Sequence, residues 1–180
     1  SNILILLDKT SHRLEACDKV PRYTFSNTLD KQQTELKNNP TLKEFATLRE
    51  ELDAADRWRP DYHFSAPDGK LNDPNGLCFW QGKWHMFYQA YPIARDRKIP
   101  HWGHAVSDDL IHWEDLPWAL YPEKDDWKIY SGTTLVEKDR VIAIHHTPKY
   151  GNYIAISKDP LLLNWERLPN PVVRTPAKGE

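Results

Sequence analysis

The apolar positions in the first third of the chain follow the period of an α-helix. Between residues 39 and 56 they are spaced three, three and four positions apart, which places them on one helix face. These residues are Leu42, Phe45, Leu48 and Leu52. Asn39-Pro40 suits the start of this helix, because proline is favoured at the first helical position, and a capping box from Thr41 to Glu44 is the alternative start.

A shorter helix is predicted from about Leu29 to Lys37, after the polar cluster Ser26-Asn27-Thr28. Pro60 marks the end of the helical region. We expect these helices to pack on the main domain with one face in solvent. A separate functional arm is the alternative interpretation.

The later part of the chain follows a strand pattern instead. Runs rich in aromatic and β-branched residues extend over Leu77–Trp80 and Lys83–Tyr88, and Gln81-Gly82 between them suits a two-residue hairpin. A second hairpin is predicted from Thr133–Val136 and Val141–His145.

A similar sequence motif follows each predicted hairpin. Ser107-Asp108-Asp109-Leu110 precedes Trp113, and Ser157-Lys158-Asp159-Pro160 precedes Trp165. The serines are 50 residues apart and the tryptophans 52. A repeat of this length, made of short strands, is typical of a β-propeller blade. A β-sandwich with two similar hairpins is the alternative.

The length of the repeat region limits the number of blades. Residues 57–180 number 124, which is about two and a half blades of roughly 50 residues. Because propellers close with four or more blades, we expect this chain to be the front part of a longer protein, or to be completed by another chain. The prediction is a mainly β fold in which residues 57–180 form the N-terminal part of a propeller domain and residues 1–56 form a helical extension.

Composition and charge narrow the function. Lys and Arg number 24 against 26 Asp and Glu, which argues against a nucleic-acid or anionic membrane partner. A mean hydropathy of −0.73 argues against a membrane span. The chain has 8 Trp, 8 Tyr and 5 Phe, and every Trp lies at or after Trp58. Such a polar, aromatic-rich chain is typical of sugar-binding proteins, although an aromatic β core would give the same composition.

The cysteines and histidines point to neither a disulfide framework nor a metal site. Cys17 and Cys78 favour a reducing compartment, with secretion still open. His101 and His104 suit pocket-lining or hydrogen-bonding roles better than metal binding. We predict no metal and no cofactor.

The most specific segment of the chain is Leu71-Asn72-Asp73-Pro74-Asn75-Gly76. Pro74 restricts the backbone of Asp73 and lacks an N–H donor, and Asn75-Gly76 is typical of turns. We expect a rigid carboxylate at the entrance of the innermost strand of the first blade, where propeller strands converge on a central pocket. An Asx-turn that only starts the strand is the alternative.

This segment and the sequence after it resemble glycoside hydrolase family 32, which contains invertases, inulinases, levanases and related β-fructosidases. The resemblance covers nearly all of residues 60–175 in the family's order, and residues 1–56 lie outside it. The matching segments are Tyr62-His63-Phe64, Leu71 to Gly76, Trp84 to Gln89, Trp102 to Ser107, Asp109-Leu110, His112-Trp113, Leu116-Pro117, Ala119 to Pro122 and Tyr130-Ser131-Gly132.

The resemblance implies a five-bladed propeller whose funnel-shaped pocket binds a terminal fructose. It implies that Asp73 is the nucleophile of a retaining double displacement, which requires an ionised carboxylate beside a protonated acid partner. The family usually has Phe where Tyr130 stands, so a packing role survives and a hydroxyl is added. The residues implied to contact the substrate are Asn72, Gln89, Trp102, Tyr130 and Ser131.

We expect two catalytic partners of this family to lie outside these 180 residues. Its second Asp lies in an Arg-Asp-Pro segment, and its acid/base Glu lies in a Glu-Cys segment. Asp159-Pro160 resembles the first, but the internal repeat aligns Asp159 with Asp109, so we interpret it as a blade turn residue. Glu137 and Glu166 fall at turns or strand ends and are poor acid/base candidates. We therefore expect the 180 residues alone to be inactive.

The leading hypothesis is the N-terminal part of a β-fructosidase that hydrolyses terminal β-D-fructofuranosyl bonds of sucrose or fructan with retention. Its partner would be a small-molecule or oligosaccharide fructoside. One alternative is a non-catalytic sugar-binding propeller. Another is a related five-bladed arabinofuranosidase, against which the Asn-Asp-Pro-Asn-Gly and Trp-Gly-His-Ala segments argue. Fructosyl transfer to a sugar uses the same residues as hydrolysis, and the sequence does not separate them.

Overall fold

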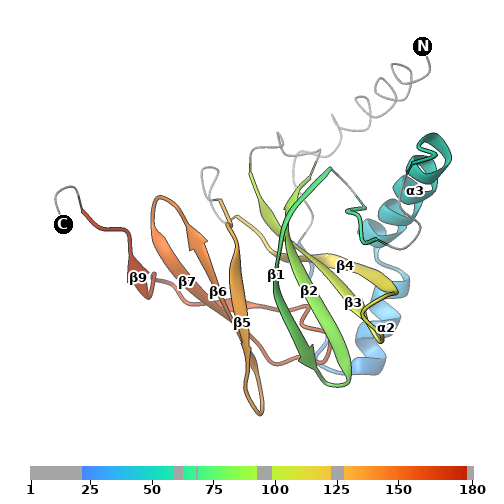
Figure 1. The fold of residues 1–180 in the computed structure, drawn as a ribbon. Helices are drawn as coiled ribbons and strands as arrows, with labels where there is room; N and C mark the ends of the chain where they lie inside the picture. The colour runs from blue at the N-terminus through green and yellow to red at the C-terminus, as the bar shows by residue number, and fades with distance from the viewer. Residues whose placement is uncertain (1–21, 59–62, 68, 93–98, 123–127, 178–180) are drawn as a thin grey trace.

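The computed structural model describes residues 22–58, 63–67, 69–92, 99–122 and 128–177, so Cys17, Pro60 and Tyr62 lie outside it. In this part of the chain two helices precede two antiparallel sheets (Figure 1). The helices are α2 (Leu29–Lys37) and α3 (Pro40–Ala55). The strands are β1 (Lys70–Trp80), β2 (Lys83–Tyr91), β3 (His101–Ser107), β4 (Trp113–Leu120), β5 (Gly132–Val136), β6 (Val141–Thr147), β7 (Gly151–Ser157), β8 (Glu166–Arg167) and β9 (Val173–Arg174).

Both helices form where the sequence predicts them. The Asn39 side chain caps α3 by accepting a hydrogen bond from the Leu42 N–H at 3.2 Å, and Pro40 occupies the first turn. The Asn39-Pro40 start is therefore the one used, and the capping box is not. Phe45 is buried on the inner face of α3, whereas Leu52 is 40% exposed. None of the helices in the described ranges is long and apolar enough to cross a membrane.

The first sheet has the strand order β1-β2-β3-β4. Gln81 and Gly82 join β1 to β2 with positive φ angles of 44° and 88°, as a tight hairpin turn requires. β1 begins at Lys70, earlier than the sequence indicates, so the Asn-Asp-Pro-Asn-Gly segment lies inside the strand and not before it. The reason is that two register shifts, between Leu71 and Pro74 and again before Cys78, let pairing with β2 continue on either side of the segment.

The second sheet has the order β5-β6-β7-β8, with β9 also paired to β7. The turn after β7 repeats the turn after β3. Leu110 and Leu162 both adopt positive φ angles, and their carbonyls accept from the indole N–H groups of Trp113 at 3.2 Å and Trp165 at 2.8 Å. The predicted repeat is therefore confirmed at the level of individual hydrogen bonds.

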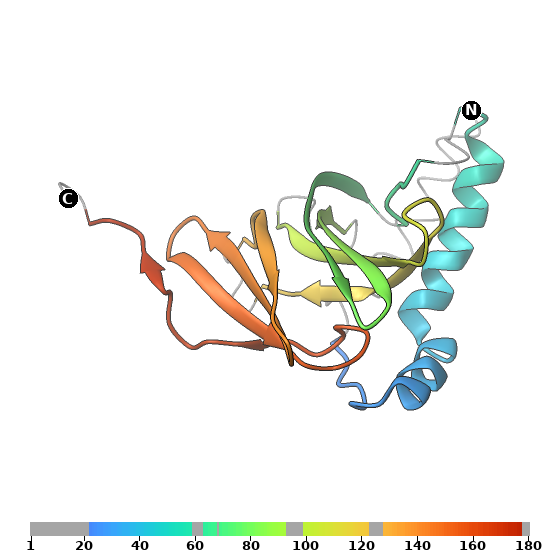
Figure 2. The ribbon, with the colours of Figure 1, turned by 60° about the horizontal axis from the view of Figure 1, so that its bottom comes forward.

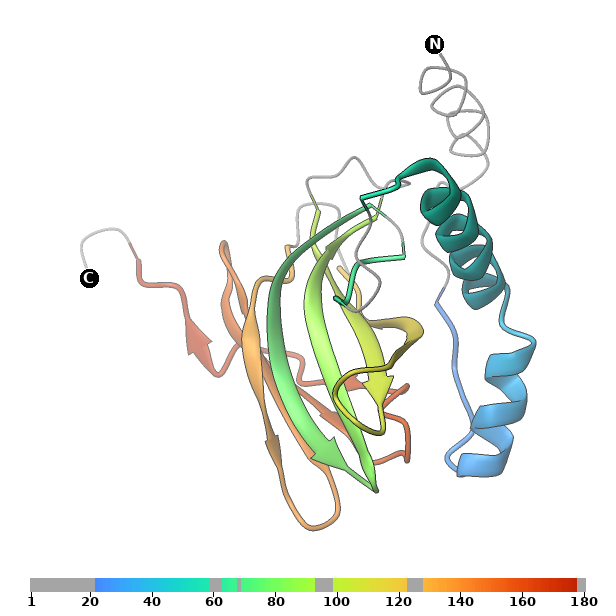
Figure 3. The same cartoon turned by 45° about the vertical axis from the view of Figure 1, so that its right-hand side comes forward.

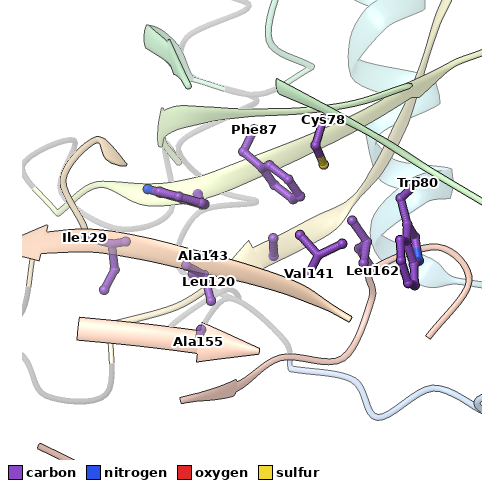
Figure 4. Packing of buried hydrophobic residues seen from close by; sticks show 11 residues of the cluster. Cys78, Trp80, Phe87, Leu120, Ile129, Val141, Ala143, Ala155 and Leu162 are labelled. Atoms are coloured by element: carbon purple, nitrogen blue, oxygen red, sulfur yellow. The ribbon is translucent and has the colours of Figure 1, made fainter. Parts of the chain in front are cut away.

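A hydrophobic core fills the space between the two sheets (Figure 4). Cys78, Trp80 and Phe87 enter it from the first sheet, and Val141 and Ala143 enter it from the second. The thiol of Cys78 packs as a small apolar group, and burial raises its pKa.

The innermost strands of the two sheets, β1 and β5, lie side by side (Figure 1). Thr134 Oγ1 on β5 donates to the Gly76 carbonyl on β1 at 2.9 Å. Gly76 has a φ of +60°, and an added Cβ there would lie 3.0 Å from the Thr134 methyl group. Glycine is favoured here because this backbone conformation strains other residues and the second sheet leaves little room for a Cβ.

The helices cover the face of the first sheet that points away from the second sheet (Figures 2 and 3). Phe45 on α3 packs edge-on against Trp118 on β4, with ring centroids 5.0 Å apart. Arg49 makes a two-pronged contact with the Asp115 carboxylate at 2.8 and 2.9 Å, and its guanidinium also donates to the Ser65 carbonyl. The helices are therefore packed elements, as the first interpretation of the sequence expected.

The segment that leads into α2 contacts the second sheet. The Phe25 N–H donates to Asn164 Oδ1 at 2.9 Å, and Asn164 Nδ2 donates to the Phe25 carbonyl at 3.0 Å. Gln32 on α2 is fully buried, donates to Asp159 Oδ1 at 2.7 Å and accepts from the Leu161 N–H at 3.1 Å. The extension thus bridges the outer parts of both sheets.

Candidate active site

The backbone irregularity in β1 places Asn72 and Asp73 at the site. Leu71 pairs with Ala90 and Pro74 pairs with Tyr88, so two residues of β1 lie opposite the single residue Gln89 of β2. Such a bulge turns side chains away from the regular alternation of a strand. As a result, Asn72 lies beside Gln89 while the Asp73 side chain is exposed.

Four side chains form a hydrogen-bonded chain that begins and ends on the bulge. Asn72 Nδ2 donates to Gln89 Oε1 at 3.1 Å, and Gln89 Nε2 donates to Ser131 Oγ at 2.8 Å. Ser131 Oγ donates to Asp73 Oδ2 at 2.8 Å. Ser131 immediately precedes β5, so this last bond joins the first sheet to the start of the second.

The second carboxylate oxygen of Asp73 is placed differently. Among the described residues, no side chain donates a hydrogen bond to Oδ1, whereas Ser131 holds Oδ2. The Asn75 side chain donates to the Asp73 main-chain carbonyl at 3.1 Å and fixes the backbone instead. The carboxylate is therefore oriented through one oxygen, and the other oxygen can act as a nucleophile.

Trp102 lies on the core side of the site. It has no exposed surface, and its indole N–H donates to the Tyr130 carbonyl at 3.0 Å. Its ring packs against Phe87 and His145 in the core between the sheets. The sequence predicts that Trp102 packs against the sugar. In the structure the ring has no exposed surface and its indole holds the main chain next to Ser131, and the contact with the sugar stays a prediction.

Tyr130 is half-buried and sits at the same junction, where its N–H donates to the His146 carbonyl at 2.8 Å. The structure therefore brings together all six residues that the sequence singles out. Asn72, Asp73 and Gln89 come from the first sheet with Trp102 below them, and Tyr130-Ser131 leads into the second.

Tyr91 belongs to this site and was not among the predicted residues. Its hydroxyl donates to Gln89 Oε1 at 3.1 Å. Burial raises the pKa of Tyr91, and the nearby Tyr130 and Asp73 raise it further. The signal was present in the sequence, because residues two apart on a strand face the same side and Tyr91 follows Gln89 by two.

Four histidines, His85, His101, His104 and His145, are buried and take no part in the hydrogen-bonded chain of the site. His85 Nδ1 and His104 Nε2 are 3.0 Å apart in a buried pair, and a ring nitrogen of His101 lies 3.0 Å from the Ile99 carbonyl. Within the described ranges, no group of three or more His, Cys, Asp or Glu side chains is arranged to hold a metal ion. His145 is buried on β6 while His146 is exposed, as alternation along a strand requires.

Comparison with known proteins identifies the family. The model of the glycosyl hydrolases family 32 N-terminal domain matches residues 63–180. The chain belongs to this family. Its two sheets are blades of the family's β-propeller, which confirms the predicted fold class.

Three related proteins illustrate the similarity. The levanase of Bacillus subtilis is 36% identical over 154 residues, which cover 74% of this chain and 23% of the levanase. A sucrose-6-phosphate hydrolase of Zymomonas mobilis is 42% identical over 106 residues, covering 58% of this chain and 20% of that protein. The structure of a fructofuranosidase from Schwanniomyces occidentalis complexed with fructose has a TM-score of 0.58 and 33% identity, covering 64% of this chain and 27% of that one. The chain therefore spans about a quarter or less of the length of the curated relatives above.

Proposed function

We propose that this chain supplies the nucleophile and part of the fructose pocket of a retaining β-fructosidase. The proposed substrates are fructosides that end in a β-D-fructofuranosyl group, such as sucrose or fructan. One observation carries the proposal: Asp73 is exposed at the junction of two blades, with Oδ2 held by Ser131 and no donor from the described residues on Oδ1.

In the first proposed step, Asp73 Oδ1 attacks the anomeric carbon of the fructosyl group. A bond forms between carbon and carboxylate oxygen, and the bond to the leaving oxygen breaks as an acid protonates that oxygen. We place this acid outside the 180 residues, because Glu137 is bonded to Arg140 at a turn and Glu166 lies on the outer strand β8. In the second step, the deprotonated acid takes a proton from water, the water oxygen bonds to the anomeric carbon, and the bond to Asp73 Oδ1 breaks, which releases fructose with retained configuration.

The network around Asp73 suits both steps. The Ser131 hydroxyl keeps one oxygen of the carboxylate in place before attack, and in the ester the same hydroxyl would donate to the carbonyl oxygen. The side-chain amides of Asn72 and Gln89 belong to the same hydrogen-bonded network, and both are proposed to bind sugar hydroxyls. Tyr130 is proposed to pack at the pocket wall, and Trp102 to hold that wall from below.

The relatives set the range of substrates to test. Their names specify levan, sucrose 6-phosphate and fructans, and one structure holds fructose. The first assay is fructose release from sucrose and levan by the whole protein that contains this chain. Binding of fructose without turnover would instead favour a non-catalytic sugar-binding protein.

The decisive variant is Asp73→Asn, which keeps the shape of the side chain and removes the nucleophilic charge. We expect fructose release to fall by about three orders of magnitude or more. Asp108→Asn is the matched control, because Asp108 is an exposed turn residue that pairs with Lys83 away from the site. Equal activity of Asp73→Asn and the unaltered protein would rule out Asp73 as the nucleophile.

A further inference from the structure

We propose that Tyr91 is a positioning residue of this site: its hydroxyl fixes the side-chain amide of Gln89 and thereby directs the Ser131 proton onto Asp73. The effect on catalysis rests on the proposed function. The positioning itself rests on the hydrogen-bonded chain and can be tested separately.

The Asp73 carboxylate determines which group donates and which accepts in each hydrogen bond of this network. An ionised carboxylate only accepts hydrogen bonds, so the single hydroxyl proton of Ser131 must be donated to Asp73. Ser131 Oγ must then accept from its other neighbour, which is the Gln89 side chain at 2.8 Å. Only the Nε2 end of that amide can donate. The charge on Asp73 thus requires one of the two orientations of the Gln89 amide.

The other end of the amide is where Tyr91 acts. With Nε2 directed at Ser131, Oε1 receives hydrogen bonds from Tyr91 at 3.1 Å and from Asn72 at 3.1 Å. Gln89 is only 5% exposed, so water cannot readily replace these donors. A reversed amide would place its N–H₂ group against the Asn72 N–H₂ group and would require the Tyr91 hydroxyl to change from donor to acceptor. The two donors therefore hold the amide in the orientation that Ser131 needs.

Tyr91 is well suited to remain a donor. Burial raises the pKa of its phenol, and the nearby Tyr130 and Asp73 raise it further, so the hydroxyl keeps its proton at neutral pH. The ring lies at the end of β2 with the Lys70 ammonium 5.8 Å from its centroid. Asn72 lies on the bulge beside Asp73, whereas Tyr91 is the last residue of β2 and pairs with Lys70 beyond the bulge.

The test begins with Tyr91→Phe in the whole protein, which removes the hydroxyl and keeps the ring. We expect kcat/KM for sucrose or levan to fall about 3- to 10-fold, the range set by one net hydrogen bond. Tyr23→Phe is the matched control, because the Tyr23 hydroxyl also makes one side-chain hydrogen bond, at 2.9 Å to Thr41 on the helical extension, and this substitution should change kcat/KM less than about twofold. A Tyr91→Phe protein as active as the control would overturn the proposal.

A double-mutant cycle with Gln89→Leu separates positioning from a general structural effect. Without the Gln89 amide the link from Tyr91 to Ser131 is gone, so adding Tyr91→Phe should change kcat/KM less than about twofold. The same loss in both backgrounds would mean that Tyr91 does not act through Gln89, and the proposal would be wrong.

The same cycle distinguishes failure of this proposal from failure of the proposed function. If the unaltered protein releases no fructose, the proposed function is wrong. The coupling between Tyr91 and Gln89 is then measured from the thermal unfolding midpoints of the same variants. Non-additive shifts for Tyr91→Phe and Gln89→Leu would still support the positioning role. Additive shifts would overturn it.

Discussion

Ser131 joins the two blades at the site through one hydrogen bond to Asp73 Oδ2. Ser131→Ala removes this donor and leaves Gln89 Nε2 without its acceptor. Hydrogen bonds to charged groups contribute about 1.5–3 kcal/mol, so we expect kcat/KM for fructoside hydrolysis to fall roughly 10- to 100-fold. Steady-state kinetics on the whole protein measure this.

Thr47→Ala is the control for Ser131→Ala. Thr47 also carries a hydroxyl with a single hydrogen bond, to the Lys43 carbonyl on α3, remote from Asp73. It should leave kcat/KM unchanged within about twofold. A Ser131→Ala protein that behaves like Thr47→Ala would show that Asp73 is oriented by other groups.

Single residues at the site were predicted unevenly. Asp73, Asn72 and Gln89 lie in segments whose order resembles one family, so their residue types were sufficient to select them. The orientation of Trp102 could not be predicted in this way. A tryptophan at this position can face either the pocket or the core. Its packing against Phe87 and His145 places the ring in the core.

At the scale of elements, Gln32 tests whether the extension and the second blade form one unit. It is fully buried, and both ends of its amide are bonded to the Asp159–Leu161 turn. Gln32→Ala should lower the free energy of unfolding by about 1–3 kcal/mol, because buried partners lose their hydrogen bonds. Urea unfolding followed by tryptophan fluorescence measures the loss.

Gln33→Ala is the matched control, since Gln33 is the exposed neighbour on the same helix. Its effect should stay within about 0.5 kcal/mol. Equal effects of the two substitutions would mean that the contact with Asp159 contributes nothing. The division of the chain at residues 56 and 57 remains a prediction in either case.

Elements with local signals were predicted closely, and β1 was not. The α2 and α3 boundaries follow from Asn39, Pro40 and the apolar period, all of which act within a few residues. The start of β1 depends on its partner strand, because pairing of Lys70 with Tyr91 continues the sheet beyond the bulge. The sequence alone contains the residues of the bulge, but it does not show how β1 and β2 pair on either side of it.

At the scale of the whole molecule, buried histidines make stability depend on pH. Burial lowers the pKa of His85 to about 4 and, with Arg167 nearby, that of His145 to about 3. Burial also lowers the pKa of His104 well below 6.5. The unfolded chain binds protons near pH 6.5 while the folded chain does not. Stability is therefore fully present above pH 6.5 and falls as the pH drops toward 4.

We expect the free energy of unfolding to fall between pH 6.5 and 5 by up to about 1.4 kcal/mol per pH unit for each buried histidine. Urea unfolding at several pH values gives this slope. His145→Gln should reduce the slope by one histidine's share, and Gln33→Ala, which removes no ionisable group, should leave it unchanged. Identical slopes for the two variants would contradict the assignment of the effect to burial.

The sequence by itself determined the propeller class, the internal repeat and the segment that carries Asp73. Turn chemistry, strand alternation and capping act over a few residues, so the chain encodes them directly. The repeated turn with Leu110 and Leu162 at positive φ is a clear example, because each tryptophan bonds a carbonyl only three residues away.

Only the tertiary structure decided which side chains meet at the site. Ser131 is 58 residues from Asp73, and Gln32 is 127 residues from Asp159, so no local pattern relates them. These contacts form because the core between the sheets sets how the blades lie against each other. Packing of the whole molecule, and not any single segment, therefore gives Asp73 its orientation.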